Sequence, residues 1–155
     1  MHFLPLTLLM DWIEIGLVGL FIAAFLSATI IPFSSELLFL AFLSSGFPLL
    51  SCVIVASAGN TLGGMSSYGL GRLGNHEKIL KYAGVSSNST RRWDGAAKRY
   101  GSVLALLCWT PIFGDIIAVS LGLFKTPFVP VLGFMTVGKT ARYAVIAIIH
   151  LKLAA

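Results

Sequence analysis

The chain has 155 residues, of which 57% are hydrophobic and 11% are charged, and its formal net charge is +5. A soluble domain is about 25% charged and needs polar groups to cover its surface, so a soluble globule is disfavoured. The high apolar content also excludes a disordered chain, and an integral membrane protein is the class that remains.

The first apolar segment covers residues 15–46 and is interrupted near its middle by Pro32 and, four positions later, by Glu36. The parts before and after the proline have 17 and 14 residues. Each is short for a crossing, which needs about 20 apolar residues. Two structures fit this pattern: two short helices, or a re-entrant hairpin whose polar tip reaches the bilayer midplane.

The next segment, residues 49–70, is long enough to span the membrane. Small residues recur at every fourth position of its second half, at Gly59, Gly63, Ser67 and Gly71. Because small side chains let membrane helices approach closely, we expect this stripe to pack against another helix.

Residues 72–99 follow as a basic linker. They include seven basic and two acidic residues, which accounts for the whole net charge. A basic block between apolar segments is typical of a cytoplasmic loop, so the linker orients the chain in a bacterial-type inner membrane. Apolar residues at helical spacing from Trp93 to Tyr100 predict a basic amphipathic helix on the membrane surface. Nucleic-acid binding by the linker is the less favoured alternative, and we expect no nucleic-acid partner.

The second half of the chain resembles the first. Residues 101–124 are apolar and are interrupted by Pro111 and Asp115, with the same spacing as Pro32 and Glu36. An offset of 79 positions also places Pro48 on Pro127, Gly59 on Gly138 and Thr61 on Thr140. We therefore predict an internal repeat within a single membrane domain.

The first repeat covers about 15–71 and the second about 100–151. If both interrupted segments are re-entrant, each repeat crosses the membrane once, and the two copies have opposite orientations. Inverted repeats with interrupted helices are the architecture of many secondary transporters. The predicted fold is therefore an all-α membrane protein, with two repeats of a re-entrant hairpin plus a transmembrane helix.

Four charged residues fall inside the apolar segments: Glu36, Asp115, Lys139 and Arg142. A charge at the bilayer centre costs about 2.5–3.5 kcal/mol on insertion scales. One interpretation is that these residues form structural ion pairs. The other, which we favour, is that they line a polar path and exchange protons or bind anionic groups, because intramembrane ionisable residues are usually functional.

The chemistry of these residues suggests two roles. Burial favours the neutral form of a carboxyl group, so Glu36 and Asp115 can exchange protons. Lys139 and Arg142 lie three positions apart on the last apolar segment, residues 127–151, and can bind a phosphate together. The histidines are scattered and no metal-ligand spacing occurs, so we expect no enzyme, no metal and no cofactor.

Four sequence blocks resemble the DedA (SNARE-associated, VTT-domain) family, and in particular its short YqaA-like branch. They are Ser27-Ala-Thr-Ile-Ile-Pro-Phe-Ser-Ser-Glu36, Gly59-Asn-Thr-Leu-Gly-Gly64, Trp109-Thr-Pro-Ile-Phe-Gly-Asp115 and Gly138-Lys-Thr-Ala-Arg-Tyr143. The resemblance implies two re-entrant hairpins related by inverted symmetry. It also implies transport of phospholipids or polyprenyl-phosphate carriers, coupled to protons.

The resemblance assigns Glu36 to the acid of the first hairpin and Pro111 to the proline of the second. The better-known branches have a further acid where residues 27–29 stand here, and arginines where Cys108 and Gly114 stand. In this chain Asp115, Lys139 and Arg142 are the candidates to replace those charges.

We therefore expect a lipid transporter or scramblase whose partners are membrane lipids and which can form a homo-oligomer. A carrier of small ions or solutes is one alternative. A non-transporting membrane scaffold, in which the buried charges are structural ion pairs, is the other.

Overall fold

The computed structural model describes residues 6–28, 35–74, 100–110 and 113–154; these residues include six helices with defined bounds, and residues 100–104 are also α-helical. The helices are α1 (Leu6–Ser27), α2 (Ser35–Ser44), α3 (Leu49–Leu73), the 3-10 helix η1 (Ala105–Trp109), α6 (Phe113–Leu123) and α7 (Phe128–Ala154). Helices α3 and α7 are long and apolar enough to cross a membrane. The expected all-α fold is therefore confirmed for these residues, and both segments predicted to span the membrane are long apolar helices.

Some predicted features lie outside the described residues. These are both hairpin breaks, at Pro32 and Pro111, and nearly all of the basic linker with its amphipathic helix. The first helix begins earlier than the apolar segment indicated. Helix α1 continues through Asp11 and Glu14, because acidic residues near the start of a long apolar helix do not end it.

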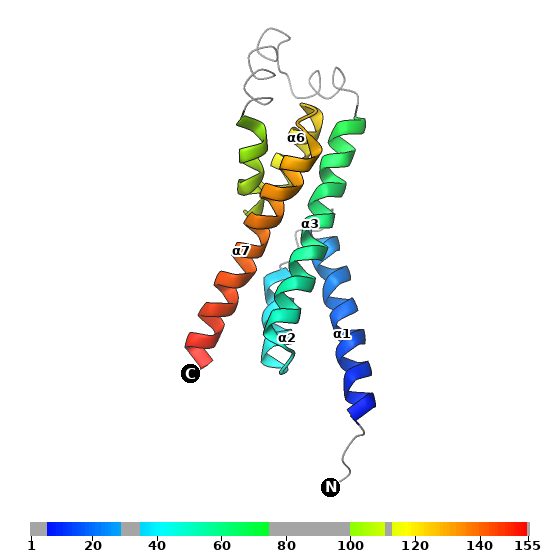
Figure 1. Cartoon of the computed structure of the whole chain (residues 1–155), viewed down its shortest axis with the longest axis vertical. Helices are drawn as coiled ribbons and strands as arrows, with labels where there is room; N and C mark the ends of the chain where they lie inside the picture. Colours follow the sequence, from blue (N-terminus) through cyan, green and yellow to red (C-terminus); the bar gives the residue numbers. More distant parts are fainter. Residues whose placement is uncertain (1–5, 29–34, 75–99, 111–112, 155) are drawn as a thin grey trace.

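Helices α3 and α7 run in opposite directions through the length of the molecule (Figure 1). Val53, near the start of α3, shares an apolar cluster with Ala147, near the end of α7. Tyr68, near the end of α3, shares a second cluster with Val131, near the start of α7. Helices α1 and α2 complete the first cluster, and η1 and α6 complete the second.

The small-residue stripe of α3 brings its backbone close to α1. A methyl group at Gly59 would overlap the carbonyl oxygen of Phe21, and one at Gly63 would overlap that of Phe25. Ser67 continues this contact, because its hydroxyl donates a hydrogen bond of 3.3 Å to the carbonyl of Ala28. These three small residues therefore set the spacing of α1 and α3.

Gly71 belongs to a different contact, between α3 and α6. A methyl group at Gly71 would overlap the carbonyl oxygen of Val119. From the other side, a methyl group at Gly122 would overlap the carbonyl oxygen of Tyr68. Helix α3 thus packs closely against α1 along its middle turns and against α6 along its last turns.

The connections α2–α3 and α6–α7 have the same backbone structure. Gly46 and Lys125, which are 79 positions apart, have positive φ angles of 86° and 52°. Three backbone hydrogen bonds of the first turn recur 79 positions later: Ser45 to Ala41, Gly46 to Leu43 and Phe47 to Phe42 match Phe124 to Ser120, Lys125 to Gly122 and Thr126 to Leu121. Because α3 and α7 begin at Leu49 and Phe128, the same offset also relates their starts.

Candidate functional site

A layer of buried polar side chains adjoins the first apolar cluster, to which Tyr143 belongs. The amide nitrogen of Asn60 on α3 donates to the hydroxyl of Tyr143 on α7 (3.1 Å) and to that of Ser35 on α2 (3.4 Å). The Tyr143 hydroxyl in turn donates to Ser35 (2.9 Å). The three side chains are buried, so this network connects three helices where water is excluded.

Lys139 extends the layer along α7. Its side chain is only 2% exposed, and its Nζ donates to both the backbone carbonyl and the Oδ1 of Asn60, each at 2.5 Å. Gly64 makes this approach possible, because a methyl group there would lie 2.8 Å from Nζ. The ammonium group is therefore hydrogen-bonded to two oxygens, as burial of a charge requires.

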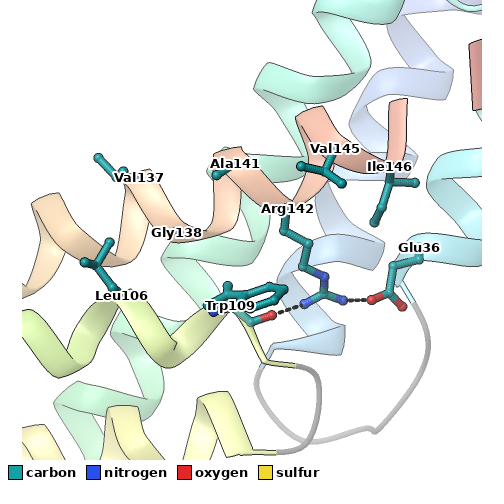
Figure 2. A pocket seen from close by; sticks show the side chains of 9 residues that line it. All are labelled: Glu36, Leu106, Trp109, Val137, Gly138, Ala141, Arg142, Val145 and Ile146. Carbon is teal, nitrogen blue, oxygen red and sulfur yellow. Dashed lines mark hydrogen bonds and ion pairs between the residues drawn. The ribbon is translucent and has the colours of Figure 1, made fainter. Parts of the chain in front are cut away.

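Glu36 and Arg142 form an ion pair between α2 and α7 (Figure 2). The same guanidinium also donates to the backbone carbonyl of Trp109 at 2.9 Å. The side chains of Arg142 and Glu36 are 11% and 24% exposed. Arg142 therefore connects α7 to Glu36 in the first interrupted segment and to Trp109 in the second.

The ion pair lies at one end of a cavity of about 530 Å³. Most of the other lining residues are apolar and come from α7 and η1, among them Leu106, Trp109 and Ala141 (Figure 2). A charged group at the end of an apolar cavity suits an amphipathic ligand.

Side-chain size differs between the two equivalent helix pairs, α3 with α6 and α7 with α2. Gly71 and Gly122 bring the backbones of α3 and α6 together, whereas the positions 79 residues away on α7 and α2 are the larger His150 and Leu43. The rings of Phe39 and Tyr143 are in contact, with centroids 5.0 Å apart. Large side chains therefore separate α2 from α7 where α3 and α6 touch through their backbones.

The structure brings together only some of the residues singled out by the sequence. Glu36 and Arg142 meet, but Lys139 is directed towards α3 and does not line the cavity. Asp115 lies in the first turn of α6, is partly buried and interacts electrostatically with Lys139 and Arg142. Within the described part of the chain it forms no ion pair within 4 Å.

Sequence reasoning did not identify Asn60, Ser35 or Tyr143 as site residues. A single amide in an apolar helix is a weak signal on its own. The stronger signal is that Asn60 falls on Lys139 at the 79-residue offset, so the repeat places two polar side chains at equivalent positions.

Comparison with known proteins now identifies relatives of the chain. It is 37% identical to the inner membrane protein YqaA of Escherichia coli (strain K12) over 139 residues, which cover 86% of this chain and 89% of that protein. The chain belongs to the YqaA family. It is thus an inner membrane protein, as the composition and the positions of the charges predict.

Other YqaA relatives are similar to the same extent. The YqaA protein of Shigella flexneri is also 37% identical over 139 residues, with the same coverage. An uncharacterized protein of Haemophilus influenzae is 35% identical over 141 residues, or 85% of each chain. No protein-family model and no solved structure matches the chain.

Proposed function

We propose that this YqaA-family protein moves a phosphate-bearing lipid across the inner membrane. The observation that carries the proposal is the apolar cavity that ends at the guanidinium of Arg142. Apolar walls suit acyl or polyprenyl chains, and a guanidinium binds phosphate through two parallel hydrogen bonds. A lipid phosphate is therefore a ligand that matches both parts of the site.

In this structure the carboxylate of Glu36 is paired with the guanidinium of Arg142. A lipid phosphate therefore has to compete with that carboxylate for the guanidinium. Protonation of Glu36 removes its negative charge and frees the guanidinium for an anionic headgroup. Proton uptake and lipid binding are then coupled through one ion pair. Asp115 is the second candidate proton carrier, because its carboxyl group is partly buried in the first turn of α6 and its negative charge acts on Arg142.

We also propose the inverted-repeat architecture of the DedA family, with the linker 72–99 on the cytoplasmic side. The matching turns and the opposite directions of α3 and α7 support it. So does the contact of Asn60 with Lys139, because residues at equivalent positions of two repeats touch when they lie near the symmetry axis. A second pair of contacts follows the same symmetry. Asn60 corresponds to Lys139 and Tyr143 to Gly64 at the 79-residue offset, and Asn60 contacts Tyr143 while Lys139 contacts Gly64.

Cysteine labelling tests this topology. Ser45 and Lys125 are exposed in the two equivalent turns, and Lys125 lies at the end of the molecule where α3 leads into the linker. In a Cys52→Ala, Cys108→Ala background, we expect a membrane-impermeant maleimide to label Ser45→Cys from the periplasm. Lys125→Cys should be labelled only after the cytoplasmic side is opened. Labelling of both from one side would contradict the inverted arrangement.

The transport proposal is tested with purified protein in liposomes that contain a labelled phospholipid or polyprenyl phosphate. We expect the wild type to accelerate transbilayer movement by at least about tenfold over protein-free vesicles, or about 1.4 kcal/mol of barrier. Glu36→Gln and Asp115→Asn should weaken its dependence on pH. An unchanged rate with wild-type protein would overturn lipid transport and leave a solute carrier or a scaffold. Intact pH dependence in both variants would overturn the proton role alone.

A further inference from the structure

The buried ammonium of Lys139 has an unusual environment. Its two acceptors are neutral oxygens, and both belong to Asn60. Asp115 acts on Lys139 electrostatically, but no carboxylate of the described residues lies within 4 Å of Nζ. The ammonium is thus stabilised by dipoles and not by a counter-ion in contact. Neutral carbonyl oxygens are also how membrane transporters hold monovalent cations at the midplane.

Helix α3 presents further oxygens on the same side. Ser57 and Thr61 flank Asn60 and share the helix face of Gly64, the residue whose missing side chain admits Lys139. Both are 4% exposed, and neither hydroxyl oxygen has a hydrogen-bond partner among the described residues. A buried hydroxyl without a partner is rare and costs free energy, so these two oxygens are available as ligands.

We propose that Lys139 is a tethered cation that fills a monovalent-cation site formed by α3. The carbonyl and Oδ1 of Asn60 are its two ligands. The hydroxyls of Ser57 and Thr61, which form no hydrogen bond with Nζ, are further oxygens on the same face of α3 that a free ion can recruit. The wild-type protein therefore has no need of Na⁺ or K⁺ at this place, because its own side chain supplies the charge. Removal of the ammonium converts the place into a site for a free ion.

Thermal unfolding of Lys139→Met tests the inference. The methionine side chain is one atom shorter than that of lysine, so it removes the charged nitrogen and leaves its place open to an ion. In NaCl, KCl and choline chloride of equal ionic strength, we expect the wild type to unfold at the same temperature. The variant should unfold at lower temperature in choline, and Na⁺ or K⁺ at about ten times its Kd should raise the Tm by about 3 °C or more.

Two variants control for unspecific effects of salt. Lys152→Met removes an exposed lysine of the same helix and should behave as the wild type does in all three salts. In Lys139→Met combined with Asn60→Leu, Na⁺ and K⁺ should no longer raise the Tm. The substitution removes Oδ1 of Asn60, and the leucine side chain blocks access to the backbone carbonyl. An equal response in that double variant would place the ion elsewhere and overturn the proposal.

Two further outcomes would also contradict the cation-site proposal. A Tm of Lys139→Met that is the same in all three salts would overturn the proposal. If the variant does not fold in choline, the yield of folded protein should be restored by Na⁺ or K⁺ during extraction, and a failure to restore it would overturn the proposal too. Stability is the quantity measured, so none of these results depends on whether the protein moves lipids.

Discussion

Arg142→Ala is expected to abolish lipid movement and to lower the free energy of unfolding by about 3–5 kcal/mol, the cost of breaking a buried ion pair. The substitution leaves the carboxylate of Glu36 in a mostly buried position without its guanidinium. It also removes the donor to the backbone carbonyl of Trp109. Denaturant or thermal unfolding in detergent, together with the liposome assay, measures both effects.

The double variant Glu36→Leu, Arg142→Met separates stability from function. Removing both charges and replacing them with apolar side chains is often neutral or stabilising, so we expect most of the lost stability to return. Lipid movement should stay absent, because neither the phosphate ligand nor the proton carrier is present. If transport returned together with stability, the ion pair would be purely structural, and lipid movement would not need Arg142 as its phosphate ligand.

The helices of this protein could largely be predicted from its sequence because their signals are local. Apolar runs predict α3 and α7, and Pro48 and Pro127 mark their starts. The 79-residue offset that relates a few identical residues in the sequence also relates the backbone hydrogen bonds of the α2–α3 and α6–α7 turns. Lys125 adopts the positive φ that Gly46 adopts in the equivalent turn, so the backbone match extends beyond residue identity.

The pairing of charges could not be predicted in the same way, because it depends on contacts between distant segments. Glu36 and Arg142 are 106 positions apart. The sequence predicts that Lys139 and Arg142 act together as neighbours on one helix face. Side chains three positions apart leave a helix about 60° from one another. With α3 on one side of α7 and η1 on the other, that angle directs Lys139 to Asn60 and Arg142 to Trp109 and Glu36.

Filling the cavity should stop transport without unfolding the protein. Ala141 lines the cavity on α7 and is exposed, so a tryptophan there has room to project into the apolar space beside Arg142 (Figure 2). We expect Ala141→Trp to reduce lipid movement by at least about tenfold, or about 1.4 kcal/mol of barrier. The free energy of unfolding should change by less than about 1 kcal/mol, as for most exposed positions.

Ile149→Trp is the matched control for this prediction. Ile149 lies on the same helix, is 52% exposed and does not line the cavity. The control should keep a wild-type rate, since its added ring does not enter the cavity. Equal inhibition by both variants would mean that bulk on α7 disturbs the protein in general. Full activity of Ala141→Trp would mean that the lipid does not pass through the cavity at Arg142, even if the protein moves lipids by another route.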